Sequence, residues 1–234
     1  MQRHLIAALA ASACLFPTLA LAETKTLDVA TFHGVDISTG IRAVVGGGKP
    51  HSVVVDADSA QALDDLRVDV RDGILYLWYD WNLLDLVNQP DRTITVTIGT
   101  EVLDTVEASA GAFVEADTLM GEDIGLEASS GANIKTTSIE GMFYTIEASS
   151  GARIDTSGLC ETADIEVSSG ASIGARDLNC KTVELEASSA GSLEITATDS
   201  ISAEVSSAGH ATVFGKPKVE HLETSSAGSV DFPG

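Results

Sequence analysis

One short motif recurs along the second half of the chain at nearly constant spacing, and this repeat restricts the folds that the sequence can adopt. A glutamate followed by Ala, Val or Thr, then serine and a run of small residues, begins at intervals of 18 to 20 residues: Glu107, Glu127, Glu147, Glu166, Glu186, Glu204 and Glu223. Such regular self-similarity is typical of repeat architectures, in which each copy contributes one structural unit.

Each copy alternates apolar and polar residues around its glutamate, which is the periodicity of a β-strand. An apolar or small residue stands directly before each glutamate, and another stands seven positions after it. A third apolar column lies twelve positions after the glutamate and contains Leu119, Ile139, Leu159 and Leu178. The pattern predicts a core of aliphatic columns with the glutamates facing outward.

Two architectures can use a strand repeat of this length. In a meander or barrel each copy would be one hairpin, with the Ser-Ser-Gly-Ala segment as its turn. In a parallel β-helix each copy is one coil, and equivalent residues stack into ladders, which explains why each column keeps its residue type. The sequence therefore favours an all-β, right-handed parallel β-helix with about 20 residues per coil.

The preceding region, residues 23–100, lacks the motif but is rich in expected strands, at residues 35–38, 41–45, 53–58 and 93–98. Ser59 is a suitable N-cap for a short helix over residues 59–66, and Asp72-Gly73 predicts a hairpin turn. We interpret this region as the opening coils and N-terminal cap of the solenoid. Together with the repeat region, residues 101–234, it would form one continuous domain over residues 27–234.

Residues 1–22 have the features of a signal peptide: a short basic start, an apolar stretch and a small-residue cleavage site ending at Ala22. Lipid modification of Cys14 is an alternative. The sequence thus predicts export to the periplasm or the cell surface, with no transmembrane segment in the mature chain. A formal charge of −22 argues against nucleic acid and anionic membranes as partners.

The N-terminal region and the repeat together resemble a known family. The pattern consists of Phe32, Val35-Asp-Ile, Val53-Val-Val, Leu66, Val68-Asp-Val, Asp72-Gly-Ile-Leu-Tyr-Leu, a strand over residues 94–98, and repeated Ser-Gly-Ala units such as Gly131-Ala-Asn-Ile134. It is similar to the putative auto-transporter adhesin, head GIN domain family, a bacterial domain of unknown function. The resemblance covers nearly the whole mature chain and implies an exported β-helical domain with an adhesin-like role.

The seven glutamates are the candidate binding residues. In a β-helix they would lie one strand spacing apart, about 4.8 Å, and repel one another. Such a column would be either a solvated face that keeps the solenoid soluble or a ladder that binds divalent cations weakly. No dedicated calcium-binding repeat, Gly-Gly-x-Gly-x-Asp, is present.

The small-residue segments are expected to form coil corners rather than catalytic sites, since no histidine stands in register with their serines. Gly111, Gly131, Gly151 and Gly170 should adopt positive φ or contact the neighbouring coil closely. The change from Ser-Gly-Ala to Ser-Ala-Gly after Gly170 suggests that the corner shifts by one residue. The histidines of the mature chain are scattered, without the spacing of a zinc site: His33, His51, His210 and His221.

Two further groups attract attention. Tyr76, Trp78, Tyr79 and Trp81 would either plug the open end of the core, with Trp78 or Trp81 mostly buried, or contact a sugar or partner protein. Cys160 and Cys180 each precede a repeat glutamate by six residues, so they should lie on adjacent coils. There they would form a disulfide in an oxidising compartment or remain side by side as free thiols.

The sequence therefore predicts a non-catalytic, exported binding or structural module of the envelope, without a cofactor, whose partner is an envelope protein or a glycan. Two other classes stay open. One is a carbohydrate-active β-helix enzyme, which requires acidic residues clustered in a cleft. The other is a cation-dependent adhesion module, which requires the glutamate column to bind divalent ions.

Overall fold

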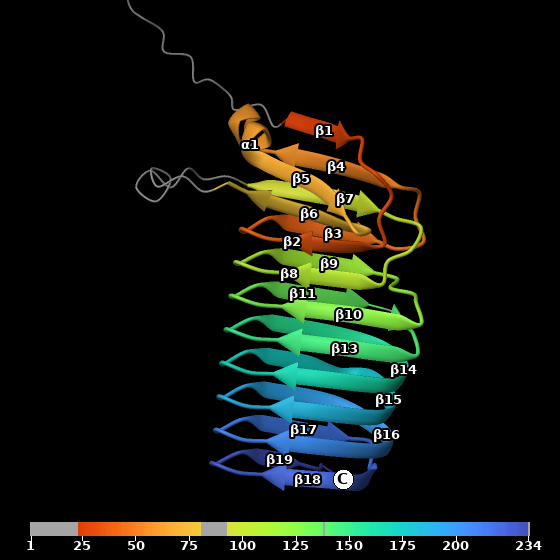
Figure 1. Cartoon of the computed structure of the whole chain (residues 1–234), viewed down its shortest axis with the longest axis vertical. Coiled ribbons are helices and arrows are strands. Elements are labelled where there is room, and N and C mark those ends of the chain that lie inside the picture. Colours follow the sequence, from red (N-terminus) through yellow and green to blue (C-terminus); the bar gives the residue numbers. More distant parts are fainter. Residues whose placement is uncertain (1–22, 81–92, 138, 234) are drawn as a thin grey trace, which may run out of the picture.

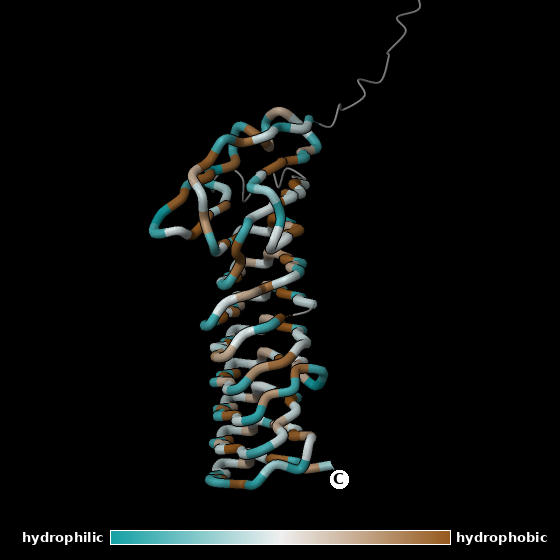
Figure 2. Tube along the Cα trace, turned by 90° about the vertical axis from the view of Figure 1, so that its right-hand side faces the viewer, coloured by the Kyte–Doolittle hydropathy of each residue, from teal (hydrophilic) through white to brown (hydrophobic). Residues whose placement is uncertain are grey.

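The computed structural model describes residues 23–80, 93–137 and 139–233, and these residues form a β-solenoid of about six turns with roughly 20 residues per coil. The predicted β-helix is therefore confirmed. In Figure 1 the nearer strands run to the left and the farther strands to the right as the chain descends, which is a right-handed winding. Seen edge-on, the coils are a narrow stack beneath a broader N-terminal end (Figure 2).

The N-terminal elements agree closely with the sequence pattern. They are β1 (Glu23–Leu27), β2 (Gly34–Ile37), β3 (Arg42–Gly46), β4 (Ser52–Ala57), α1 (Ala60–Asp65), β5 (Leu66–Arg71), β6 (Ile74–Tyr79) and β7 (Ile94–Gly99). Ser59 is the N-cap of α1, and its side chain accepts a hydrogen bond from the backbone N–H of Ala62. Asp72 and Gly73, at φ 51° and 79°, form the turn of the β5–β6 hairpin.

The repeat follows as parallel strands that wind from coil to coil. They are β8 (Thr105–Ala108), β9 (Phe113–Asp117), β10 (Asp123–Ala128), β11 (Asn133–Thr137), β12 (Ile139–Glu140), β13 (Phe143–Ala148), β14 (Arg153–Val167), β15 (Ser172–Ala187), β16 (Ser192–Val205), β17 (His210–Phe214), β18 (Lys218–Thr224) and β19 (Ser229–Asp231). The long strands β14, β15 and β16 pass around one edge of the solenoid and contribute to both of its faces.

Two stacks of strands make the two faces. The ladder face consists of β6, β2, β8, β10, β13, the C-terminal halves of β14, β15 and β16, and β18. The back face consists of β7, β3, β9, β11, the N-terminal halves of the same long strands, β17 and β19. Strands β1, β4 and β5 and helix α1 lie over the N-terminal end (Figure 1).

The spatial order of the first strands differs from their sequence order. The coil made by β2 and β3 lies inside the stack, because β2 pairs with both β6 and β8 while β3 pairs with both β7 and β9. After β3 the chain returns to the N-terminal end, where β4 pairs antiparallel with β1 and β7. Antiparallel pairing ends the parallel stack and covers its edge.

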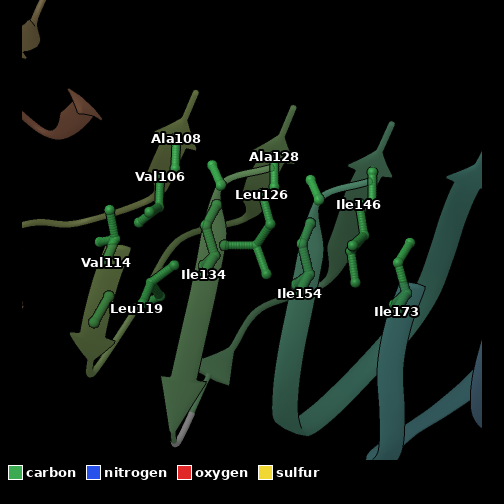
Figure 3. Close-up of a cluster of buried hydrophobic side chains, with 14 of the residues drawn as sticks. Val106, Ala108, Val114, Leu119, Leu126, Ala128, Ile134, Ile146, Ile154 and Ile173 are labelled. Carbon is green, nitrogen blue, oxygen red and sulfur yellow. The ribbon is translucent and has the colours of Figure 1, made fainter. Parts of the chain in front are cut away.

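The core is the set of aliphatic columns that point between the two faces. Val106, Leu126 and Ile146 from the ladder face meet Val114, Ile134 and Ile154 from the back face (Figure 3), and all six side chains are at most 2% exposed. Alanines fill the narrower positions beside them. Burying such columns removes apolar surface from water along the whole stack, which is the main stabilising contribution in a solenoid.

The prediction that Leu159 belongs to the third apolar column is wrong. Leu119, Ile139 and Leu178 are fully buried as expected, but Leu159 is 65% exposed and Gly158 occupies its place in the register. This coil is one residue shorter than its neighbours, and a shift of one residue moves a side chain to the opposite face. Tyr144 fills the core of the same coil and donates a hydrogen bond from its hydroxyl to the carbonyl of Leu159 at 3.1 Å.

The corners behave as predicted in one respect and differently in another. Gly111, Gly131, Gly151 and Gly170 all have φ between 71° and 75°, which confirms the left-handed bend. The corner does not shift in the later copies: Ala190, Ala208 and Ala227 take the same left-handed position at φ 61°, 61° and 64°. Gly191, the residue after Ala190, faces the preceding coil. A Cβ there would lie 2.7 Å from the carbonyl oxygen of Val167, so only glycine fits.

Cys160 and Cys180 lie opposite each other on β14 and β15, as their spacing predicts. Their Cα atoms are 4.5 Å apart, and a disulfide joins the side chains. Both residues are buried, so the bond connects two successive coils from inside the edge of the solenoid. Within the described ranges, no helix has the length and apolar character needed to cross a membrane.

Candidate functional site: the acidic ladder face

The repeat glutamates form a continuous column on the ladder face. Each one pairs in register with the next, from Glu107 on β8 to Glu223 on β18. Asp36 on β2 pairs with Glu107 and extends the column by one coil. Sequence analysis missed Asp36 because it lies outside the repeat, although the alternation of Val35, Asp36 and Ile37 already indicates an outward carboxylate.

A second outward column lies beside the glutamates, because residues two apart on a strand share a face. Its members from β8 to β18 are Thr105, Gly125, Thr145, Asp164, Glu184, Ser202 and His221. No lysine or arginine stands in either column between β8 and β18. The back face differs, since its outward positions mix both signs, as at Glu115, Lys135 and Arg153. The negative charge is therefore concentrated on the ladder face.

Crowding changes the acidity of the column. Partial burial and the neighbouring charges of Asp36 and Glu127 raise the pKa of Glu107 above its usual value. The pKa of Asp36 is raised by burial and by Glu127, against a smaller lowering effect of Arg71. Burial and carboxylates on both adjacent coils also raise the pKa of Glu147 and of Glu186. Burial is the larger cause of each of these shifts and the neighbouring carboxylates add to it, so ionising these four side chains is less favourable in the fold than in water.

The hollows along this face are shallow. One of about 90 Å³ lies where Gly125 leaves a gap between Thr105 and Thr145, beside Glu107 and Glu127. Another, of about 100 Å³, lies between glutamates and corner serines of the last coils. Sites for small organic ligands are usually about 300–1,000 Å³. The ladder face is thus better suited to an extended partner or to ions than to a small organic substrate.

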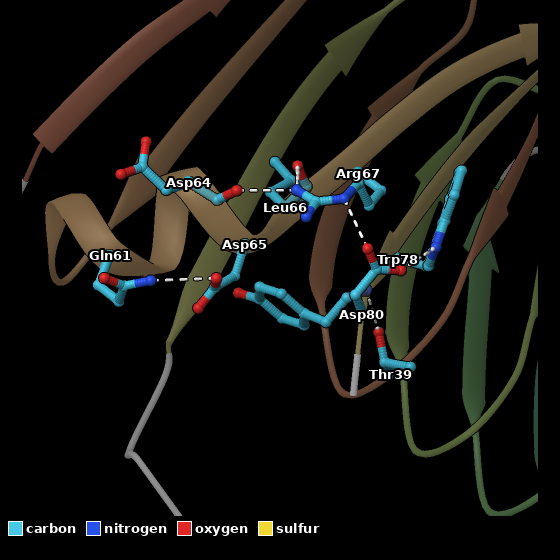
Figure 4. A network of polar contacts seen from close by, with 9 residues as sticks. Thr39, Gln61, Asp64, Asp65, Leu66, Arg67, Trp78 and Asp80 are labelled. Carbon is cyan, nitrogen blue, oxygen red and sulfur yellow. Dashed lines mark hydrogen bonds and ion pairs between the residues drawn. The ribbon is translucent and has the colours of Figure 1, made fainter. Parts of the chain in front are cut away.

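Aromatic side chains lie at the N-terminal end of the same face. Tyr76 pairs in register with Asp36, so it continues the acidic column, and the Arg71 guanidinium lies 4.6 Å from its ring centre. Trp78 also points outward, and its indole N–H donates to Asp80, which in turn accepts from Arg67 (Figure 4).

Alternation along β6 sends Leu75, Leu77 and Tyr79 into the core and leaves Trp78 partly exposed on the outside. The expectation that Trp78 or Trp81 is mostly buried stays a prediction. Trp81 lies outside the described residues.

One histidine departs from the expected scatter. His221 on β18 lies on the ladder face with its Nε2 3.8 Å from a carboxylate oxygen of Glu204 and 4.0 Å from one of Glu223. The His-x-Glu spacing, two residues apart on a strand, was the signal in the sequence that could have identified this arrangement. Within the described residues, His33 pairs with Asp104 at 2.8 Å beside the start of β8, and His51 contacts the Val29 carbonyl.

Comparison with known proteins agrees with this architecture. A family model described as putative auto-transporter adhesin, head GIN domain, matches residues 31–217. The chain belongs to this family. The match begins before β2 and ends before β18, so it includes both the rearranged N-terminal strands and most of the glutamate ladder. No curated protein matches the sequence.

Solved structures share the fold of this GIN-domain protein at low sequence identity. A putative adhesin from Bacteroides fragilis is 17% identical with a TM-score of 0.73, covering 91% of this chain and 97% of that one. A putative adhesin from Parabacteroides merdae is 16% identical with a TM-score of 0.66, at 91% and 96% coverage. A putative lipid binding protein from Parabacteroides distasonis is 15% identical with a TM-score of 0.65, at 91% and 97% coverage.

Proposed function

We propose that the protein is an exported, non-catalytic adhesin-like module that binds a positively charged protein of the cell envelope through its ladder face. The carrying observation is the in-register column from Asp36 to Glu223. A column of like charges with no basic residue in it attracts an extended basic surface, and it accelerates association with one. Family membership supports an adhesin-like role, and the features of residues 1–22 support export.

The flatness of the face supports a macromolecular partner. Outward side chains spaced at the strand repeat present many weak, equivalent contacts, which suit an extended chain or a second flat surface. Tyr76 and Trp78 at the N-terminal end of the column add aromatic surface that can anchor such a partner. Cationic groups also bind well to aromatic faces.

Binding of poly-L-lysine to the purified protein tests this proposal. The triple variant Glu127→Gln, Glu147→Gln and Glu166→Gln should bind it at least tenfold more weakly than the wild type at low ionic strength. A matched control, Glu115→Gln, Asp117→Asn and Glu194→Gln, removes the same charge from exposed positions of the back face. Equal weakening by both triples would show that net charge alone is responsible and would refute a specific role for the ladder face.

A second candidate function is cation-dependent adhesion. The raised pKa values of Glu107, Glu147 and Glu186 favour it, because bound divalent ions would relieve the same repulsion. Calcium at millimolar concentration should then raise the melting temperature, and the ladder triple should abolish that increase. The enzyme alternative finds no support on the ladder face, where the hollows are about 90 and 100 Å³. A larger hollow of about 290 Å³ lies on the back face, where Glu115, Asp117 and Lys135 line it.

A further inference from the structure

The last turn of the ladder places an imidazole beside two carboxylates. β16 supplies Glu204, and β18 supplies His221 and Glu223. One donor atom from each side chain can be chosen so that all three lie within 4.8 Å of one another. The side chains are 55% to 68% exposed, so a dissolved ion can reach them and each can adjust its rotamer.

A β-bulge creates this arrangement. Ile201 pairs with Val219 and the next residue, Ser202, pairs with His221, so Glu220 is an extra residue in β18. If β18 continued from Val219 without a bulge, Glu220 would pair with Ser202 and His221 would take the register position of Leu222, opposite the buried Ala203. Bulges commonly redirect a side chain in this way. The result is a histidine on the outward face, two residues before Glu223 and diagonal to Glu204.

The set of donors differs from the rest of the ladder in its chemistry. The equivalent position on the other repeat coils holds threonine, glycine, serine or a carboxylate, so an all-oxygen environment surrounds the other glutamates. An imidazole with two carboxylates is a set that zinc and related first-row ions prefer, whereas calcium and magnesium prefer oxygen alone. Selectivity for a transition metal therefore depends on His221.

The geometry needs only small adjustments. Ligand atoms about 2.0–2.2 Å from a tetrahedral ion lie about 3.4 Å apart. The Nε2 of His221 is 3.8 Å from Glu204 and 4.0 Å from Glu223, and the donor atoms of the two glutamates lie within 4.8 Å of each other, so rotamer adjustments of about 1 Å or less in these exposed side chains bring the three together. Three protein donors leave a fourth position for water.

We infer that Glu204, His221 and Glu223 bind a divalent transition metal ion of the zinc class. The ion would connect two strands, β16 and β18. Every residue of β18 is exposed, and among the strands that the structure describes it pairs with β16 alone. Metal binding would therefore hold the last described strand of the ladder face to the stack. This role is separate from the proposed attraction of a basic partner, which depends on the whole column.

Zinc titration of the purified, tag-free protein by calorimetry tests the inference. The wild type should bind one zinc ion, and His221→Ala should weaken that binding at least tenfold, whereas His210→Ala on the back face should leave it unchanged. Binding of copper(II) should give the nitrogen hyperfine signal of one imidazole, which His221→Ala removes. Zinc should also slow amide hydrogen exchange in β18.

Three results would overturn it: no zinc binding by the wild type, equal binding by His221→Ala, or calcium binding that competes equally for the same site. Because His221 is exposed, its replacement should not disturb folding, and far-ultraviolet circular dichroism checks this. Poly-L-lysine binding should be unaffected by His221→Ala. Loss of the metal site and loss of the proposed adhesin-like function are therefore distinguishable.

Discussion

Replacing one glutamate in the middle of the ladder should stabilise the protein. Glu147 lies between Glu127 and Glu166 in register, and its pKa is raised by burial and by both neighbours. Glu147→Gln keeps the size and shape of the side chain but removes its charge. The folded state loses two repulsive contacts, whereas the unfolded chain, in which these glutamates are far apart on average, loses little.

The magnitude follows from the strand spacing. Two unit charges about 4.8 Å apart in water repel by about 0.9 kcal/mol, so two neighbours contribute about 1.7 kcal/mol. Screening at physiological ionic strength, with a Debye length of about 8 Å, reduces this to about 1 kcal/mol. For a chain of this size, about 1 kcal/mol corresponds to an increase of about 2–4 °C in the melting temperature.

Thermal unfolding at two salt concentrations checks this reasoning. The gain from Glu147→Gln should be largest near 0.01 M salt and nearly absent near 1 M, where the Debye length is about 3 Å. Glu140→Gln is the matched control, because Glu140 pairs in register with Met120 and Leu159 and not with a carboxylate. A gain that persists at high salt, or an equal gain in the control, would refute electrostatic repulsion as the cause.

Three further changes have defined outcomes. Stability should increase as the pH falls from neutral toward 4.5, because the folded-state pKa of Glu107 is raised above that usual value. The folded state then binds a proton before the unfolded chain does, and this contribution is lost as the pH rises through the folded pKa. Urea midpoints measured from about pH 7 down to 4.5 check it. Replacing Cys160 and Cys180 together by alanine should lower the free energy of unfolding by about 3 kcal/mol, as expected for a loop of about 20 residues. Thiol titration of the unfolded, unreduced wild-type chain beginning at residue 23 should find no free thiol. Ala190 and Gly151 both have a left-handed backbone conformation, which glycine adopts at less cost than alanine. Ala190→Gly should therefore raise the free energy of unfolding by about 0.5–1 kcal/mol, and Gly151→Ala should lower it by a similar amount. Chemical denaturation of the two variants compares these changes.

The repeat predicted the fold because a β-helix displays its register in the sequence. Each coil repeats the same few environments, so a column of glutamates or aliphatic residues appears as a period near 20 residues. Local signals were equally informative where the chemistry is local, as with Ser59 at the N-cap and Asp72-Gly73 in the hairpin turn. The spacing of Cys160 and Cys180 placed them on adjacent coils for the same reason.

The features that sequence analysis missed depend on contacts that no local pattern encodes. Nothing in β2 or β3 indicates that β6 and β7 will return to pair on their other side. The short coil at Leu159 contains one deletion whose position only the register with Ile139 and Leu178 reveals. The bulge at Glu220 is similarly invisible, although it decides which way His221 points.

The glutamate ladder itself is not required by the fold. The column beside it contains threonine, glycine, aspartate, glutamate, serine and histidine on the same strands, so outward positions of this face accept many residue types. Replacing the glutamates by threonine would preserve every core contact and strand hydrogen bond and would remove repulsion of about 0.5 kcal/mol per pair at physiological ionic strength. A sequence feature that opposes stability without serving packing is most simply explained by function. The cost of the ladder is therefore best explained by a use for its charge, either in attracting the proposed basic partner or in keeping the solenoid soluble.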